Sequence, residues 1–171
     1  MEAKKPSDSL AVKTELVLPN DTNTLGNLMG GKLLHWMDIA GAMSAYRHCR
    51  RVVVTASVNN VSFGHPIKLG DIVTIEAKVS RAFNTSMEVI MDVSIEHQNT
   101  GEKILCNQAI YTFVAVDQLG NPIEVPPVIP ETEEEKKRYD AALRRRQLSL
   151  ILAGKMKAEE ATELKALFFD K

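Results

Sequence analysis

The sequence predicts an α+β domain in which one long, apolar helix packs against an antiparallel β-sheet, followed by a C-terminal helical extension. Three observations lead to this prediction. A single helix-like stretch in the first half of the chain is apolar on almost every side, so it needs burial. Several other stretches have the composition and alternation of strands. The connections between the later strands are too short for crossover helices.

The composition and charge are those of an ordinary globular domain. The chain has 171 residues, of which 44% are hydrophobic and 25% are charged, and this length favours one domain. Its 21 basic and 22 acidic residues give a net charge of −1, so we expect no nucleic-acid partner. The N-terminus is polar and no apolar run approaches ~18 residues, which predicts no signal peptide, no membrane association and a cytoplasmic location.

The first third of the chain is predicted to hold a strand, a shaped loop and the central helix. We interpret residues 1–9 as a flexible leader, after which residues 10–18 form a strand that Pro19 ends. Residues 20–31 are rich in Asn, Asp, Thr and Gly, which favour turns through side-chain to backbone hydrogen bonds and permissive dihedral angles. Residues 32–48 contain no Pro and no β-branched run, which predicts the buried helix.

The middle of the chain is predicted to supply four further strands. Within one of them, apolar side chains fall on one face while Glu88 and Asp92 fall on the other, so we expect that face of the sheet to be wet. Short connections such as residues 83–85 predict hairpins and antiparallel pairing in sequence order. The four strand-like stretches are residues 52–63, 72–83, 86–96 and 103–116.

The chain beyond a proline-rich segment is predicted to form a helical extension. Helix-like composition covers residues 131–150 and 158–169. Opposite charges at i,i+3 and i,i+4 spacing predict a solvated helix face, and the apolar residues there need cover from the body or from a neighbouring subunit. We therefore divide the chain into residues 1–9, 10–127 and 128–171.

A glycine pair and an aspartate near the start of the central helix suggest chemistry. Gly30 and Gly31 expose backbone N–H groups where the helix dipole favours negative charge, which suits the oxyanion of a reacting carbonyl. Asp38 lies among apolar neighbours, where an ionised carboxylate needs a hydrogen bond or a role such as a general base. The spacing alone leaves two alternatives open: close packing at the glycines and a structural acceptor at Asp38.

Other kinds of site lack the necessary spacing. The segment Gly30-Gly31-Lys32 has neither the earlier glycine nor the following Ser or Thr of a phosphate-binding loop. Cys49 and Cys106 are not in Cys-x-x-Cys spacing, so we expect free thiols. His35 and His48 are not spaced as metal ligands on one helix face, and we expect no metal site. No serine has the glycine-flanked elbow of a hydrolase triad.

Six segments occur in an order that is specific to one family. They are GNLMGGKLLHWMDIAGAMSAYRHC, VVTASVNNVSF, HPIKLGD, TSMEV, TGEK and TFVAVD. Together they resemble the hot-dog acyl-CoA thioesterases of the YciA and brain acyl-CoA hydrolase type, from about Thr14 to about Pro127. The resemblance implies a hot-dog fold, with a long central helix wrapped by the antiparallel sheet. It also implies homo-oligomers, in which dimers of hot-dog domains assemble into a hexamer.

The resemblance also implies an activity and its catalytic residues. Members of this family hydrolyse acyl-CoA to a fatty acid and free coenzyme A, with an acidic residue on the helix and a polar residue before it. Asp38 and Asn27 occupy these positions, and each site would combine Asn27 of one subunit with Asp38 of the other. Asp38 would act as general base or as nucleophile, Asn27 would position water or substrate, and Gly30 and Gly31 would bind the oxyanion.

The resemblance further implies where the substrate binds. One family strand lines the pantetheine channel, and the TSMEV segment marks a hairpin that contacts coenzyme A. No cofactor is expected, because coenzyme A is part of the substrate and product. The candidate substrate- and CoA-binding residues are Thr55, Ser57, Asn60, Arg81, Asn84, Thr85 and Ser86.

Two alternatives to thioester hydrolysis are open at this point. Gly64-His65-Pro66 suggests a hot-dog hydroxyacyl dehydratase, which an enoyl thioester hydration assay would identify. A non-catalytic acyl-CoA-binding sensor is the other alternative. Such regulators lack the catalytic carboxylate and carry a DNA-binding module, whereas this chain has Asp38 and a balanced charge.

Overall fold

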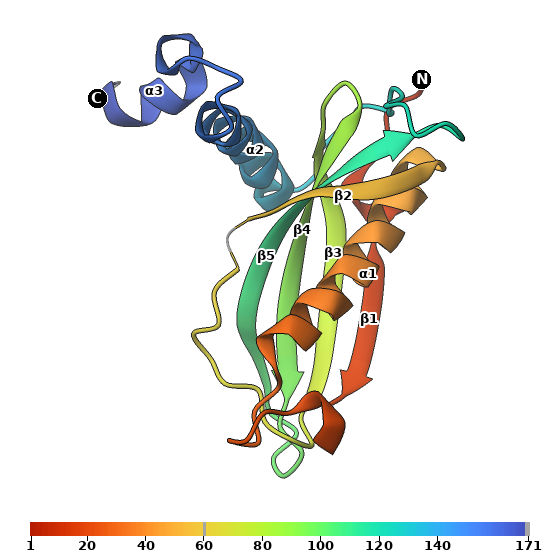
Figure 1. Ribbon diagram of the computed structural model, residues 1–171, viewed down its shortest axis with the longest axis vertical. Coiled ribbons are helices and arrows are strands. Elements are labelled where there is room, and N and C mark those ends of the chain that lie inside the picture. The colour runs from red at the N-terminus through yellow and green to blue at the C-terminus, as the bar shows by residue number, and fades with distance from the viewer. Residues whose placement is uncertain (60, 170–171) are drawn as a thin grey trace. The chain divides into compact units, whose positions relative to one another are not determined.

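The computed structural model describes residues 1–59 and 61–169 of the chain. It contains two compact units, Met1–Ile129 and Pro130–Lys171, which we describe separately. The predicted α+β fold is confirmed. The first unit has one long helix against an antiparallel sheet, and the second unit is helical (Figure 1).

A five-stranded sheet forms the larger part of the first unit. Its strands lie in the order β1-β3-β4-β5-β2, so β1 and β2 are its two edges. All neighbouring strands pair antiparallel. The short connections predict this for β3, β4 and β5, whereas the pairings of β1 with β3 and of β2 with β5 were not predicted. The strands are β1 Ala11–Leu16, β2 Val52–Asn59, β3 Ile72–Ala82, β4 Ser86–Glu96 and β5 Lys103–Val116.

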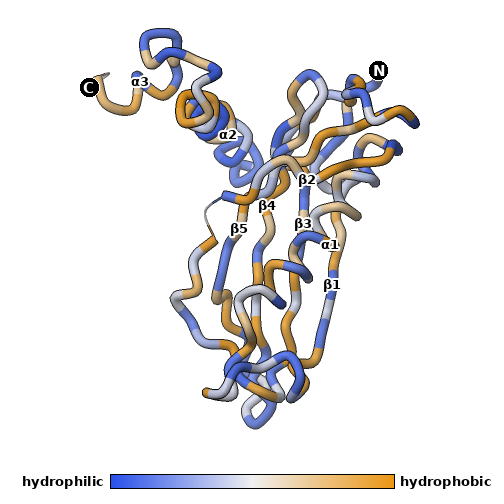
Figure 2. The backbone as a smooth tube through the Cα atoms, in the orientation of Figure 1, coloured by the Kyte–Doolittle hydropathy of each residue, from blue (hydrophilic) through white to orange (hydrophobic). Residues whose placement is uncertain are grey.

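Helix α1, Gly30–Cys49, lies across one face of this sheet (Figure 1). Its inward-facing Met37 and Ala40 are fully buried. A Cβ on Gly41 would lie only 2.8 Å from Cε2 of Phe113 on β5, so glycine permits the close approach of helix and sheet. Hydrophobic residues run along the helix and the strands beneath it (Figure 2). This packing fixes the position of α1 on the sheet.

Two predicted strands are shorter in the structure. β1 ends at Leu16 because Pro19 begins a 3₁₀ turn, Pro19–Asp21. β2 ends at Asn59, and residues 61–71 form an irregular connection that contains Gly64 and Pro66. This connection returns to the start of α1, where it forms part of a pocket described below.

The expectation of a wet face on β4 is wrong for the first half of the strand. Residues 86–91 are all buried, and Glu88 is only 4% exposed. Ser80, at a bulge in β3, donates its hydroxyl to Oε1 of Glu88 at 2.6 Å. The carboxylate is therefore hydrogen-bonded instead of solvated. Only from Asp92 onward do alternate side chains reach solvent.

The residues before β1 pack against the first unit. Lys4 Nζ donates to the carbonyl of His48, near the end of α1, at 2.6 Å. Residues Pro6–Ser9 form a 3₁₀ turn, and the hydroxyl of Ser9 accepts the N–H of Val79 at 2.9 Å. Part of the segment for which the sequence predicts a flexible leader thus makes specific contacts with the domain.

The second unit contains a long and a short helix. Thr132 and Glu135 form a capping box that starts the long helix, two residues later than predicted. Gln147 accepts the N–H of Leu164 at 2.9 Å and so links the two helices. In the part of the chain that the structure describes, no helix is both long and apolar enough to cross a membrane. The elements are α2 Glu133–Leu152, η3 Ala158–Glu160 and α3 Thr162–Phe169.

Candidate active site

A tight loop of residues 21–29 leads into α1. Thr22 and Leu28 form an antiparallel bridge, and the N–H of Asn23 donates to the carbonyl of Asn27 at 2.8 Å. Oδ1 of Asn23 accepts the N–H groups of Leu25 and Asn27, at 2.9 and 3.2 Å. The side-chain carbonyl of Asn23 therefore shapes the loop. Its amide nitrogen has no hydrogen-bond partner among the described residues.

Gly30 and Gly31 are the first two residues of α1. In the first turn of a helix the N–H groups lack an acceptor one turn earlier, so they point out of the helix end. A Cβ on Gly30 would lie 3.3 Å from Cζ of Phe63, whereas none of the described atoms lies within 4 Å of a Cβ on Gly31. The helix end therefore has two glycine N–H groups and open space beside one of them.

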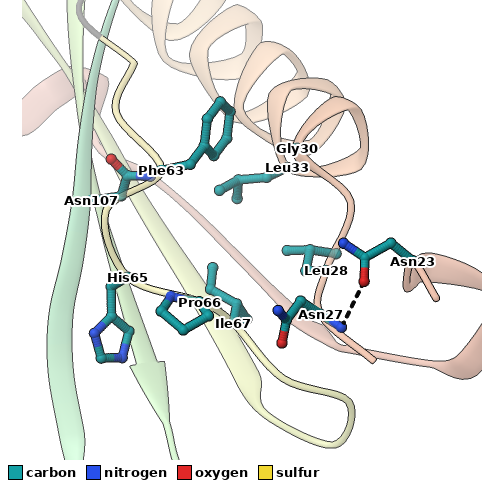
Figure 3. Close-up of a pocket in the computed structure, with 10 residues that line it drawn as sticks. All are labelled: Asn23, Asn27, Leu28, Gly30, Leu33, Phe63, His65, Pro66, Ile67 and Asn107. Atoms are coloured by element: carbon teal, nitrogen blue, oxygen red, sulfur yellow. Dashed lines mark hydrogen bonds between the residues drawn. The ribbon is translucent and has the colours of Figure 1, made fainter. Parts of the chain in front are cut away.

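A pocket of about 340 Å³ lies at this helix end (Figure 3). Its wall combines apolar side chains with three side-chain amides and one imidazole. Such a mostly apolar pocket with a few polar groups suits a small organic group that has one polar end. The lining residues are Asn23, Asn27, Leu28, Gly30, Leu33, Phe63, His65, Pro66, Ile67 and Asn107.

Asp38 is half-buried on α1 and is held by a residue of β2. The hydroxyl of Thr55 donates to Oδ1 of Asp38 at 2.6 Å. Oδ2 accepts no hydrogen bond from the described residues, so it is available to water or substrate. The carboxylate thus has one fixed and one available oxygen, an arrangement that suits a base or a nucleophile.

Tyr111 on β5 lies beneath this part of α1. Its hydroxyl donates to the carbonyl of Leu34, one helical turn before Asp38, at 3.1 Å. Burial, together with the negative charge of Asp38, raises the pKa of Tyr111 to about 12. The phenol therefore stays protonated and supports the helix as a hydrogen-bond donor at neutral pH.

Within one chain, the structure does not bring Asp38 together with Asn27. Asp38 follows Gly30 by eight residues, roughly 12 Å along a helix axis. Asn27 and Gly30 line the pocket, and Asp38 does not. One chain therefore has two separate groups of candidate residues: a carboxylate held by Thr55, and a helix end with its neighbouring amides.

Two of the predicted CoA-binding residues, Thr55 and Ser57, lie on edge strand β2. A β-bulge separates them, so the register to β5 shifts at this point. Oγ of Ser57 accepts a hydrogen bond from Nδ2 of Asn59 at 3.2 Å. The hydroxyl of Thr55 donates to the carboxylate of Asp38, as described above. The remaining prediction on this segment, Asn60, lies outside the described residues.

The other four, Arg81, Asn84, Thr85 and Ser86, lie together at the β3–β4 hairpin. Asn84 is exposed, Arg81 and Thr85 are half-buried, and Ser86 is buried. The guanidinium of Arg81 lies 5.6 Å from the centre of the Phe83 ring. The hairpin thus has a cation and polar groups close to the surface.

The hairpin and the start of β2 lie at the same end of the sheet. Val114 on β5 pairs with Ser86 on one side and with Val54 on the other. Two strand spacings, roughly 10 Å, therefore separate Ser86 from Val54. Because Thr55 follows Val54, the predicted substrate-binding residues of β2 and those of the hairpin lie at the same end of the first unit.

The described residues contain no group of three or more His, Cys, Asp or Glu side chains that could hold a metal ion. Cys49 and Cys106 are free thiols. Burial raises the pKa of both, which keeps them protonated and poorly nucleophilic at neutral pH. The carboxylate and the helix end are thus the groups suited to acyl chemistry.

Three contributors to these two groups were not predicted from the sequence: Asn23, Asn107 and Tyr111. Asn23 lies in a stretch whose composition signals a turn, but the direction of its side chain depends on the hydrogen bonds of the folded loop. Asn107 lines the pocket and Tyr111 bonds to α1, and both lie on β5, far from the helix in sequence. No local pattern in the sequence reports such a contact.

Known proteins resemble this chain over most of its length. The thioesterase superfamily model matches residues 25–102. The chain is 44% identical over 144 residues to a Bacillus subtilis (strain 168) protein named uncharacterized acyl-CoA thioester hydrolase YkhA, covering 84% of each. The chain belongs to the acyl-CoA thioesterases. It is also 42% identical over 144 residues to mouse acyl-coenzyme A thioesterase 11, spanning 84% of this chain but only 24% of that longer protein.

Solved acyl-CoA thioesterase structures have the same hot-dog fold. A structure described as an apo-hexameric acyl-CoA thioesterase is 39% identical, with a TM-score of 0.86, over 90% of this chain and 98% of that one. An acyl-CoA hydrolase from Staphylococcus aureus, in complex with butyryl coenzyme A, coenzyme A and coenzyme A disulfide, is 38% identical. Its TM-score is 0.81, over 88% of this chain and 94% of that one. Its alanine variants at one aspartate, one asparagine and one threonine have also been solved.

Proposed function

We propose that this chain hydrolyses the thioester of acyl-CoA to a carboxylic acid and free coenzyme A. The observation that carries the proposal is the Asp38 carboxylate, fixed by Thr55 at 2.6 Å on the central helix of a chain from a thioester hydrolase family. The relatives named above are hydrolases or thioesterases, which favours hydrolysis over the dehydratase and sensor alternatives.

The helix end would bind the reacting carbonyl. Gly30 lines a pocket with an apolar wall and Gly31 follows it in the first helical turn, so an acyl chain in this pocket would place its thioester oxygen near the N–H groups of the helix end. These groups would stabilise the oxyanion of the tetrahedral intermediate. One such donor contributes about 3 kcal/mol to the stability of a transition state.

Asp38 would activate the attacking group in one of two ways. As a general base, it takes a proton from a water whose oxygen attacks the thioester carbon, and the departing thiolate of coenzyme A then receives a proton. As a nucleophile, Oδ2 attacks the same carbon, the thiolate leaves, and water hydrolyses the resulting anhydride. Both routes use the available oxygen and the oxygen fixed by Thr55.

We further propose that each active site is shared between two subunits. Asp38 and the helix end are separated within one chain, so a second copy is needed to complete a site from both. Edge strand β2 has exposed apolar side chains beside an exposed stripe of α1, which favours pairing of two chains along this edge. The exposed residues are Ile39, Met43 and Tyr46 of α1 and Val52, Val54 and Val58 of β2.

Two asparagines are candidates for the polar partner of Asp38. Asn27 is the one that the family resemblance implies, and it lines the pocket. In the Staphylococcus aureus hydrolase, the replaced asparagine precedes the replaced aspartate by 15 positions, and the replaced threonine follows it by 17. In this chain the same spacings from Asp38 lead to Asn23 and Thr55. We therefore propose Asn23 beside Asn27, with its side-chain nitrogen as the donor.

The remaining proposals concern coenzyme A binding, assembly, domain limits and location. We propose that the hairpin residues Arg81, Asn84, Thr85 and Ser86, with Ser57 on β2, bind the coenzyme A part of the substrate, which makes a separate cofactor unnecessary. The hexameric neighbour supports a homohexamer built from dimers. We also propose the domain limits 10–127 and 128–171. A rat relative named cytosolic acyl coenzyme A thioester hydrolase supports a cytoplasmic location.

The direct test measures the release of free thiol from acyl-CoAs of increasing chain length. Wild type is expected to release thiol, and Asp38→Ala is expected to lose at least about a hundredfold in kcat while remaining folded. Asp92→Ala is the matched control, because Asp92 is also a half-exposed carboxylate that accepts a side-chain hydrogen bond, from Gln108 at 2.8 Å. Thiol release by Asp38→Ala at the wild-type rate would remove Asp38 from this role.

The same assay separates the two asparagines. Asn23→Ala and Asn27→Ala are each measured beside wild type, and the residue whose loss lowers kcat more is the functional partner of Asp38. Binding of acyl-CoA without thiol release by wild type would contradict the proposed hydrolysis and favour a sensor.

A further inference from the structure

Asp21 and Lys32 form an ion pair at the base of the loop that leads into α1. Nζ of Lys32 lies 3.2 Å from Oδ1 of Asp21. Oδ2 of Asp21 accepts the N–H of Leu18 at 3.0 Å. Asp21 is only 4% exposed, whereas the side chain of Lys32 is 37% exposed, so the carboxylate lies out of solvent and the ammonium group is partly solvated.

The same two residues connect both ends of the loop to the helix end. The carbonyl of Asp21 accepts the N–H of Met29, the residue just before Gly30, at 2.9 Å. Lys32 is the third residue of α1 and lies directly after the glycine pair. A main-chain hydrogen bond and an ion pair therefore hold the loop and the first helical turn in one arrangement.

The charges of this pair also matter at a helix N-terminus. A lysine in the first turn opposes the helix dipole, which favours negative charge there. A buried aspartate alone at this place would disfavour a second negative charge nearby. Together the two charges cancel, so the helix end keeps its preference for an incoming anion.

We propose that Asp21 and Lys32 are positioning residues for thioester hydrolysis, which hold the first turn of α1 in place and neutralise each other beside the oxyanion-binding N–H groups. The inference rests on the proposed function, because it concerns the same helix end. Neither residue is assigned a contact with substrate. Their effect acts through the geometry of Gly30 and Gly31 and through the charge near them.

The test compares Lys32→Met, Lys32→Arg and the double variant D21N/K32M with wild type in the thiol-release assay. Lys32→Met leaves the buried Asp21 carboxylate with the N–H of Leu18 but without a cation, and we expect kcat to fall by about tenfold or more. Lys32→Arg keeps the charge and should retain most of the activity. The double variant removes both charges and should recover part of the loss. The inhibition constant of free coenzyme A should stay at its wild-type value in all three.

Lys13→Met is the matched control. Lys13 pairs with Glu15 on β1 at 2.7 Å, so this variant also removes the cation of an ion pair in the first unit. It should leave both kcat and the inhibition constant unchanged. Circular dichroism and the melting temperature of each variant report on folding independently of the assay.

Several outcomes would overturn the inference. If Lys32→Met lowers only the melting temperature and keeps the wild-type kcat per folded molecule, the pair is structural. If Lys32→Met does not fold, the other two variants decide, and equal wild-type kcat in both contradicts a positioning role. If the wild-type protein releases no thiol, the proposed function itself is overturned. If wild type is active and the Lys32 variants keep the wild-type kcat, only this inference is overturned.

Discussion

At the scale of single residues, the proposed hydrolysis depends on one carboxylate and the hydroxyl that holds it. Thr55 donates to one oxygen of Asp38, which leaves the second oxygen available. A carboxylate with one fixed oxygen loses rotational freedom before substrate arrives, so less entropy is lost in reaching the reactive geometry. The bulge that follows Thr55 in β2 turns this part of the edge strand and is typical of strands beside active sites.

Thr55→Val tests this arrangement because valine has the same shape and lacks the donor. We expect kcat to fall about tenfold, since a hydrogen bond to a charged group contributes about 1.5–3 kcal/mol, and Thr55→Ser should retain most of the activity. KM should change less than kcat. Steady-state kinetics of thiol release measure both.

Thr14→Val is the control for this substitution. Thr14 is an exposed strand threonine that shares a hydrogen bond with another side chain, Thr74, at 3.3 Å. Its replacement should not change kcat. An equal loss of activity in both threonine variants would contradict a specific role for Thr55.

Residue-scale prediction from the sequence succeeded where a local pattern was strong. The glycine pair does start the helix, and Asp38 does lie on it, because apolar periodicity and turn composition are local signals. The partner of Asp38 was less predictable. The sequence predicts Thr55 as a substrate-binding residue, and nothing in it indicates the hydrogen bond from Thr55 to Asp38, 17 positions away, which the packing of β2 beside α1 creates.

At the scale of elements, the loop and the first turn of α1 form one unit. The loop closes through its own hydrogen bonds, and Asp21 links its base to both Leu18 and Lys32. The sequence indicated a shaped loop from its Asn, Asp, Thr and Gly content. The sequence could not show which of these side chains stabilises the helix end. Asp21 and Lys32 are eleven positions apart, and only the folded loop between them brings their charges together.

The stability of this unit should depend on pH. The N–H of Leu18 and then Lys32 lower the pKa of the Asp21 carboxyl below its ordinary value, in spite of its burial. The folded state therefore favours the charged form. This stabilisation is fully present above the unfolded pKa of about 3.9 and is lost as the pH falls through the lower, folded pKa.

Asp21→Asn measures this contribution. At pH 7 we expect the variant to be less stable than wild type by about 1–3 kcal/mol, because it loses hydrogen bonds to a charged group. The difference should shrink when unfolding is measured at decreasing pH below about 4. Urea unfolding followed by circular dichroism at each pH gives both curves. A difference that stays constant down to low pH would contradict the role of the charge.

Element-scale predictions failed mainly at the ends of strands. Residues 52–63 have a uniform β-like composition, but β2 stops at Asn59, and the chain beyond it lines the pocket through Phe63 and His65. Composition does not tell a strand from an extended connection that folds back on the domain. The buried Glu88 is a similar case, since Ser80 satisfies it from the neighbouring strand.

At the scale of the whole molecule, the sheet has an edge strand, β2, that has no neighbouring strand on its outer side in the described chain. β2 pairs only with β5 in the described chain, and apolar side chains of β2 and α1 are exposed beside it. Exposed edges of this kind favour pairing with another chain. The short connections predict the order β3-β4-β5, but nothing in the sequence places β1 and β2 in the sheet, so the sequence could not predict that β2 would be the edge next to Asp38.

The second unit belongs to the same scale. Its two helices are linked by Gln147 and Leu164, and several apolar side chains near the ends of both helices are exposed. The charged pairs that predicted a solvated face are present, for example Lys136 with Glu133 at 2.8 Å. Exposed ion pairs of this kind contribute little to stability, so they do not explain what holds the two helices together.

Complementation between two impaired variants tests whether each active site is shared between two subunits. Asp38→Ala and the less active of Asn23→Ala and Asn27→Ala are purified separately, mixed under conditions that exchange subunits, and assayed for thiol release from acyl-CoA. In a symmetric dimer with shared sites, one of the two sites in each mixed dimer is intact, so equal mixing should restore about one quarter of wild-type activity. A mixture no more active than its components, with subunit exchange verified, would contradict a site shared between subunits.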